Sequence, residues 1–232
     1  MRPRWIVSAL TPALLLALTA CAKTDGEKTH GGPTAPLTPP APTVALAGLP
    51  AGNIRARLET SEGVVDCELS PATAPRAVAL FVGLATGRAN WLDPSAHAVV
   101  TRPMYRQLKF FRAVPDAFVQ SGCPLGNGTG TPGYRIPIET SPDDAQRLAR
   151  AGALMLAGYH APPNRVDPSP PAAGQIIGSQ FVIGLGDLSH MAGQVSVLGS
   201  CTDLDHVRAI AAKVAAHGEV RLERAVIEGI DD

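Results

Sequence analysis

The chain has 232 residues and a formal net charge of zero, with 20 Lys and Arg against 20 Asp and Glu. Charged residues make up only 17%, which argues against nucleic-acid binding, because neutralising phosphates requires a basic face. Hydrophobic residues make up 45%, which excludes a wholly disordered protein, and 23 Gly with 22 Pro argue against a helical bundle.

The first twenty residues have the pattern of an export signal. Arg2 and Arg4 precede an apolar run from Trp5 to Leu18, and small residues follow it. A basic start, a short apolar run and small residues are the parts of a secretory signal peptide. The run is too short for a comfortable span of a hydrocarbon core about 30 Å thick. Residues 1–20 are therefore predicted to be a signal peptide.

The residues up to Cys21 predict a lipid anchor. Leu18-Thr19-Ala20-Cys21 resembles the lipobox of bacterial lipoproteins, which implies cleavage before Cys21 and acylation of that residue. Each buried CH₂ contributes roughly 0.8 kcal/mol, so several acyl chains anchor a protein stably. In some Gram-negative bacteria an Asp after the lipidated Cys retains the protein at the inner membrane. Ala22 follows here, which favours the outer membrane on its periplasmic side. The alternative is a plain signal peptide.

Residues 21–50 are rich in Pro and Gly and predict a flexible tether, so 51–232 form the globular domain. Beyond Cys21 the cysteines are Cys67, Cys123 and Cys201. Export permits disulfides, and three cysteines allow at most one pair, either Cys67–Cys201 or Cys123–Cys201. The six histidines show no ligand spacing, so neither a metal nor another cofactor is expected.

The domain is predicted to begin with a β-hairpin followed by a helix. Apolar and polar residues alternate over 54–59 and again over 65–69, with a turn between them. Pro75 suits the first turn of a helix and Gly87 its end, with an apolar stripe between the two.

Short apolar or alternating runs predict the remaining strands. These runs are 108–114, 117–120, 153–157, 180–183, 195–198 and 220–227. A second helix is predicted from Asp203, whose side chain is expected to cap it, to a stop at Gly218. Roughly eight short strands and two helices predict a mainly β fold, a closed antiparallel barrel with helices at its ends.

Two adjoining strands place three distinctive side chains together. Arg112 lies on the first strand, and Phe118 and Gln120 share a face of the second because they are two residues apart. A guanidinium, a ring and an amide on one face suit a bound peptide. The alternative is an ordinary strand pair whose Arg stem covers apolar surface.

Two further motifs are predicted to lack the chemistry they suggest. Gly126–Gly133 contains G-x-G-x-x-G, but Pro132 and Pro137 forbid the helix that a dinucleotide site requires, which leaves a glycine-rich turn. Asp187, Ser189 and His190 are too close in sequence to converge as a hydrolase triad, and we expect them in a loop beside a binding groove.

Several separated motifs resemble, in order, those of the cyclophilin family of peptidyl-prolyl isomerases. Residues 110–133 are similar to its Phe-His-Arg, Gln-Gly-Gly and Gly-Thr-Gly-Gly segments. Residues 152–157 match its next core strand, and Gly178-Ser179-Gln180-Phe181-Val182-Ile183 its Gly-Ser-Gln-Phe-Phe-Ile segment. The resemblance implies a closed eight-stranded antiparallel β-barrel capped by two α-helices.

The resemblance also implies the site residues. Arg112 aligns with the catalytic arginine of the family, and it is the only residue to which the resemblance assigns catalysis. The residues that it implies for substrate binding are Phe118, Gln120, Ala157, Gln180, Val182, His190 and Met191.

The site departs from the family pattern at several positions, among them Val195, near which a groove histidine of the family falls. Ala117 and Val182 stand where the family has phenylalanines, and His190 where it has a tryptophan. The segments 90–103 and 159–177 are also longer than in small family members. The loss of rings from the proline pocket implies reduced activity.

Three functions follow as hypotheses. The first is a peptidyl-prolyl cis–trans isomerase for exported proteins, with Arg112 stabilising the twisted amide. The second is a prolyl-peptide binding module with weak or no catalysis, and the third is a structural lipoprotein. The expected partners are proline-containing polypeptides and, through the lipid anchor, a membrane, but no nucleic acid. The protein is expected to be a monomer.

Overall fold

The computed structural model describes residues 53–158 and 175–230, and this part of the chain is mainly β. Burial alternates along β1 (Ile54–Thr60) and over most of β2 (Gly63–Leu69), as the hairpin prediction requires. The other strands are β3 (Trp91–Asp93), β4 (Ala98–Val100), β5 (Arg106–Lys109), β6 (Arg112–Val114), β7 (Phe118–Ser121), β8 (Arg135–Pro137), β9 (Ala153–Gly158), β10 (Gln175–Gly184), β11 (Ser196–Cys201) and β12 (Arg221–Glu228). The helices are α1 (Pro75–Thr86), α2 (Asp144–Leu148) and α3 (Leu204–Ala215), and η1 (Ser189–Met191) is a single 3₁₀ turn.

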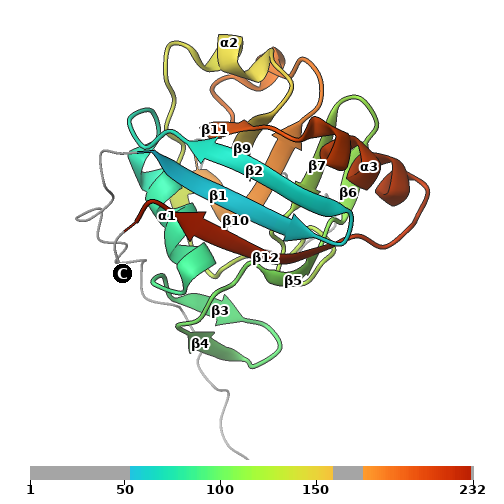
Figure 1. Ribbon diagram of the computed structural model, residues 1–232. Coiled ribbons are helices and arrows are strands. Elements are labelled where there is room, and N and C mark those ends of the chain that lie inside the picture. The colour runs from blue at the N-terminus through green and yellow to red at the C-terminus, as the bar shows by residue number, and fades with distance from the viewer. Residues whose placement is uncertain (1–52, 159–174, 231–232) are drawn as a thin grey trace, which may run out of the picture. The chain divides into compact units, whose positions relative to one another are not determined.

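The described strands form one large curved sheet and one small hairpin. The order in the large sheet is β5-β12-β1-β2-β11-β9-β10-β7-β6, with β8 also paired to β10, which makes ten strands. All these pairs are antiparallel, and β3 pairs only with β4. Figure 1 shows β12, β1 and β2 in front, with β10 and β7 behind them. The mainly β, antiparallel prediction is confirmed.

The prediction of a closed eight-stranded barrel is wrong in closure and in strand number. Residues 108–114, expected to form one strand, break at Phe110 and Phe111 into β5 and β6. The Phe110 N–H donates to Val220 O (3.0 Å) and the Phe111 N–H to Gln120 O (3.1 Å), so neighbouring residues join different parts of the sheet. Within the described residues β5 and β6 do not pair, so the sheet is an open half-barrel.

The two predicted helices are present, and a third, short helix was not predicted. Pro75 occupies the first turn of α1, and Gly87 ends it in a left-handed conformation (φ 83°) that suits glycine. Helix α1 packs against β10, β11 and β12, whereas α3 packs against β2, β6 and β7. Helix α2 has five residues and β3, β4 and β8 have three each, too few for a periodic signal.

The end of α3 differs from the prediction. The helix ends at Ala215, before Gly218, and the left-handed residue is His217 (φ 62°). The His217 N–H donates to Val214 O (3.0 Å) and the Gly218 N–H to Lys213 O (2.8 Å). These bonds satisfy two carbonyl groups that the helix end leaves unpaired. The left-handed residue that ends the helix is therefore His217, and not a glycine as predicted.

Two hydrophobic clusters lie on opposite faces of the central strands. The main core contains Leu154 and Leu156 of β9, together with Phe181, Tyr105 and Phe81. A smaller cluster uses the alternate residues of β9, and we call it the second cluster. Its buried members are Leu148, Ala153, Met155, Ala157, Val182, Leu188, Val195 and Val197. Because side chains alternate across a strand, the second cluster lies on the face away from the main core.

The long segment 90–103 forms the β3–β4 hairpin, held by a buried carboxylate. Asp93 is 2% exposed and its Oδ1 accepts the Ser95 hydroxyl (2.6 Å) and N–H (2.8 Å). Arg102 forms an ion pair with Asp93 and lies 5.7 Å from the centre of the Trp91 ring. Burial alone would raise the pKa of Asp93, but the bonds from Ser95, Arg102 and Ala96 together lower it to about 2.

The lowered pKa of Asp93 predicts a pH-dependent contribution to stability. An unfolded Asp titrates near pH 4, so the contribution is complete above about pH 4 and is lost as pH falls towards 2. The shift corresponds to about 2 kcal/mol. We expect Asp93→Asn to lower the free energy of unfolding at about pH 5, with the difference from wild type shrinking towards about pH 2. Denaturant unfolding at each pH measures it, with Asp205→Asn as the control because Asp205 is 99% exposed. A pH-independent difference would contradict the prediction.

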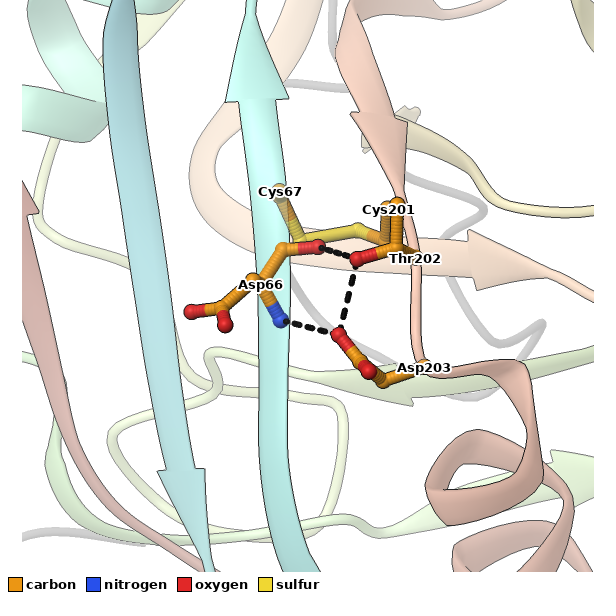
Figure 2. Close-up of a disulfide and its surroundings, with 5 residues drawn as sticks. All are labelled: Asp66, Cys67, Cys201, Thr202 and Asp203. Atoms are coloured by element: carbon orange, nitrogen blue, oxygen red, sulfur yellow. Dashed lines mark hydrogen bonds between the residues drawn. A yellow bond between two sulfur atoms is a disulfide. The ribbon is translucent and has the colours of Figure 1, made fainter.

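A disulfide joins β2 to β11 (Figure 2). Cys67 and Cys201 lie directly opposite each other in the ladder, with Cα atoms 3.8 Å apart and a sequence separation of 134. Of the two pairings considered from the sequence, the structure contains Cys67–Cys201, and Cys123 is a buried free thiol.

The pairing of β2 with the chain after β11 continues beyond the disulfide through Asp203. The Thr202 N–H donates to Asp66 O (2.8 Å), and the Thr202 hydroxyl donates to Asp203 Oδ2 (2.7 Å). The Asp66 N–H also donates to Asp203 Oδ2 (3.4 Å; Figure 2). Asp203 stands at the N-cap position of α3, but its side chain makes no cap bond, which corrects the prediction. The carboxylate links α3 to β2 instead.

Removing the disulfide is expected to destabilise the domain. Closing a loop of 134 residues restricts the unfolded chain, and loss of such a link typically costs about 2–5 kcal/mol. We expect that much loss in the Cys67→Ala/Cys201→Val variant, measured by denaturant unfolding. Peptide mapping after alkylation without reductant should find Cys67 linked to Cys201 and Cys123 alkylated. An unchanged unfolding free energy would contradict the prediction.

None of the described helices is both long and apolar enough to cross a membrane. Several predictions fall on residues outside the described part of the chain: the signal peptide (1–20), the lipidation of Cys21, the rest of the tether (22–50) and residues 159–174 of the long loop.

Candidate active site

A cavity of about 300 Å³ opens on the face of the sheet that carries the second cluster. It brings together every site residue predicted for the domain except Gln180. The lining residues are Arg112, Phe118, Gln120, Ala157, Val182, His190, Met191, Gln194 and Val195.

The β6–β7 pair forms one wall of the cavity. Arg112 lies opposite Gln120 in the ladder, and Val114 lies opposite Phe118. The turn between the strands is tight, since Asp116 is left-handed (φ 59°) and the Ala117 N–H donates to Val114 O (3.0 Å). This register places Arg112 and Gln120 side by side, as the sequence predicted.

The Arg112 guanidinium stacks on a ring rather than pairing with an acid. Its central carbon lies 5.0 Å from the centre of the Phe118 ring. Among the described residues, Arg112 has no ion pair, and no carboxylate lines the cavity. The guanidinium N–H groups are therefore available to a ligand, while the ring restricts where they lie.

The rest of the cavity is apolar at its floor and polar at its rim. Ala157 of β9, Val182 of β10 and Val195 are buried members of the second cluster. Met191 packs against them, and Gln194 donates from Nε2 to His190 O (3.0 Å). An apolar floor with a few polar groups suits the ring and the backbone of a prolyl peptide.

Gln180 does not line the cavity, although the resemblance implied that it binds substrate. It is 4% exposed, and its Nε2 donates to Gly128 O and to Gly130 O, both at 2.9 Å. Its Oε1 accepts from Gln120 Nε2 (3.1 Å). Gln180, which lies outside the cavity lining, therefore fixes the orientation of the Gln120 amide.

The glycine-rich turn that accepts these bonds is organised by a thiol. Cys123 is fully buried, and its Sγ accepts the N–H groups of Gly128 and Gly130, both at 3.2 Å. The turn was correctly predicted to lack a following helix, since the next element is β8. Its function in holding Gln180 was missed, because backbone carbonyls leave no signature in sequence.

One lining residue, Gln194, was missed, because it carries no recognisable motif. Val195 lines the cavity near the position where the resemblance put a groove histidine of the family. Asp187 accepts the Ser189 N–H (2.9 Å), which, together with the Ser189 hydroxyl, lowers the pKa of Asp187. This local turn, with His190 in the cavity wall, matches the expected loop beside a groove. Among the described residues, no three His, Cys, Asp or Glu side chains cluster as a metal site would require.

Comparison with known proteins assigns the chain to a family. The family model described as cyclophilin type peptidyl-prolyl cis-trans isomerase/CLD matches residues 55–231. The chain belongs to the cyclophilin family. This cyclophilin is 30% identical over 184 residues to the peptidyl-prolyl cis-trans isomerase B of Streptomyces anulatus, covering 78% of this chain and 97% of that protein. It is also 30% identical to the peptidyl-prolyl cis-trans isomerase A of Mycobacterium tuberculosis, covering 80% and 96%.

Solved structures agree on the fold. A cyclophilin type peptidyl-prolyl cis-trans isomerase of Cryptosporidium parvum superposes with a TM-score of 0.57 at 21% identity, covering 78% of this cyclophilin and 100% of that chain. A second crystal structure of the same protein, determined in the presence of the dipeptide Ala-Pro, gives a TM-score of 0.56.

The amide link between Gln180 and Gln120 predicts a loss of stability when it is cut. Gln180→Met keeps the volume but removes the donor to the buried Gly130 carbonyl and to the partly buried Gly128 carbonyl, which costs about 1–3 kcal/mol. Denaturant unfolding measures the loss, and the side-chain amide NMR signal of Gln120 should shift. The matched control is Gln194→Met, which removes an exposed amide and should change stability by less than about 0.5 kcal/mol. Equal stability of the two variants would refute the positioning of Gln120 by Gln180.

Proposed function

We propose that this cyclophilin accelerates the cis–trans rotation of X–Pro bonds in exported polypeptides, with Arg112 as the catalytic residue. The observation that carries the proposal is the Arg112 guanidinium, which forms no ion pair with any described residue and is held over Phe118 and beside Gln120 in a cavity with an apolar floor. The named relatives are peptidyl-prolyl isomerases, which supports the reaction. The Ala-Pro dipeptide used with the Cryptosporidium protein supports proline-containing peptides as the ligand class.

The mechanism requires no covalent step. Rotation about the X–Pro bond meets a barrier of about 18–20 kcal/mol, because the planar amide is stabilised by resonance. Twisting the bond returns a lone pair to the prolyl nitrogen, which becomes a hydrogen-bond acceptor. A donor aimed at that nitrogen stabilises the twisted state more than either planar state, and only such differential binding speeds the reaction.

In this proposal, each lining residue has a separate function in binding or catalysis. The Arg112 guanidinium donates to the twisted amide. Phe118, Val182 and Met191 contact the proline ring, and Ala157 lies beside them on the floor. Gln120 binds the flanking backbone, because its Nε2 has a second N–H and its Oε1 has free lone pairs. Its fixed orientation reduces the entropy lost when the peptide binds.

A second candidate function is a prolyl-peptide binding module with weak or no catalysis. The observation that favours it is the size of the side chains around the proline site. Val182 forms the floor, Ala117 does not line the cavity, and His190 forms part of the wall. A wider pocket restrains the ring less, so less binding energy is available to the twisted state.

We also propose where the protein acts. The sequence up to Cys21 supports cleavage, acylation and anchoring at the periplasmic side of the cell envelope, with the outer membrane favoured by Ala22. The tether then gives a monomeric domain access to newly exported chains. Metabolic labelling with a fatty-acid analogue in a bacterial host tests the anchor, and Cys21→Ser is its control.

The catalytic proposal predicts a large effect of Arg112. Full-length protein should accelerate isomerisation of a short Ala-Pro peptide, measured by NMR exchange spectroscopy. Arg112→Ala should lower kcat/KM about 100-fold, the usual cost of removing a donor to a transition state. Arg112→Lys should retain part of the activity, because it keeps the charge but loses the planar fork.

The other outcomes contradict either the role of Arg112 or the proposed reaction. Catalysis that survives Arg112→Ala would show that Arg112 is not the catalytic residue. Wild type that binds the peptide without catalysis would support the binding module. Absence of binding would support a structural lipoprotein.

A further inference from the structure

A second cavity, of about 440 Å³, opens on the same side of the sheet as the active site. It lies between α2 and the strands β9 and β11. The residues that line it are Gln146, Arg147, Arg150, Ala151, Ala153, Gly199, Ser200 and Cys201.

The two cavities are aligned along β9. Ala157 lies at the active-site cavity and Ala153 at the second cavity, and both belong to the second cluster. Four residues of extended strand separate them, which is about 13 Å. A polypeptide bound in the active site therefore has its neighbouring residues within reach of the second cavity.

The second cluster also joins α2 to the residues before η1. Leu148 of α2 and Leu188 before η1 are both buried in this cluster, and the Leu188 N–H donates to Leu148 O (2.9 Å). The distance of about 13 Å along β9 is a straight-line span, and a bound chain that follows the protein surface takes a longer path. At about 3.3 Å per residue, some five to eight residues connect the two cavities.

The second cavity is basic. Arg150 is exposed and forms no ion pair with any described residue. Arg147 donates to Thr73 Oγ1 (2.8 Å), and its Nη1 lies 3.7 Å from the buried Asp144. Among the described residues, no carboxylate lines the cavity, although Glu68 lies opposite Ser200 in the neighbouring strand. Arg147 is paired with Asp144, so Arg150 is the lining cation that remains for a ligand.

We propose that the second cavity binds an acidic segment of the same polypeptide whose X–Pro bond occupies the active site. This inference rests on the proposed function. Arg150 and Arg147 bind the carboxylates, and Gln146 and Ser200 supply further donors at the rim. The preferred substrates are chains with Asp or Glu residues some five to eight positions from the proline. Charge complementarity and continuity with the active-site face favour this occupant.

The test compares two peptides of about fourteen residues with full-length protein. Both contain one Ala-Pro bond, and one carries three Glu residues about six positions away where the other carries three Gln. Isomerisation is measured by NMR exchange spectroscopy, and affinity is measured separately by titration. We expect the Glu peptide to bind about fivefold more tightly at low salt, with the advantage shrinking at high salt.

Matched variants assign the effect to the second cavity. Arg150→Gln should abolish the difference between the peptides. Arg106→Gln removes the same charge from an exposed residue of β5, far from α2 (Figure 1), and should retain the difference. A Glu preference that survives Arg150→Gln, or that Arg106→Gln also abolishes, would refute the site.

The experiment separates the two proposals. Equal affinity for both peptides, with both isomerised, would overturn the second site and leave the proposed function intact. Isomerisation of neither peptide would overturn the catalytic proposal. The titration then decides the second site alone, because tighter binding of the Glu peptide that is lost in Arg150→Gln supports it and equal binding overturns it.

Discussion

The pairing of β6 with β7 is the constraint on which the site depends. Its register places Arg112 beside Gln120, and the tight turn at Asp116 keeps Phe118 close enough to stack under the guanidinium. A slip of one residue would turn both Phe118 and Gln120 to the other face of the strand. Gln180 and the Cys123 turn reinforce this register from behind, because they tie Gln120 to a second part of the chain.

The two faces of the sheet separate stability from ligand binding. The main core holds the large buried aromatic side chains, such as Phe81 and Phe181, which contact edge to face. The cavity floor belongs to the smaller second cluster, with short side chains such as Ala157 and Val182. Changes of residue size in the floor therefore leave the main core intact.

The sequence predicted the elements with a repeating signal and missed those without one. The β1–β2 hairpin, α1 and α3 were predicted, because their apolar residues recur with a clear period. The break at Phe110–Phe111 was missed, because a two-residue change of partner leaves the pattern of a strand intact. Motifs led to Arg112 and Gln120, since local register decides where they lie. The burial of Gln180 was not predictable, because it depends on carbonyl groups fifty residues away in the chain.

The connectivity of the disulfide has a consequence for a chain that crosses a membrane from its N-terminus. Of the three cysteines that follow Cys21, Cys67 emerges first, Cys123 next and Cys201 last, so the native bond skips the middle one. An oxidase acting on the nascent chain meets Cys67 and Cys123 together before Cys201 arrives. Native pairing thus requires either that Cys123 is sequestered early by its glycine turn or that a wrong bond is later exchanged. For the proposed exported form, maturation would therefore depend on a disulfide isomerase whenever oxidation outpaces that local burial.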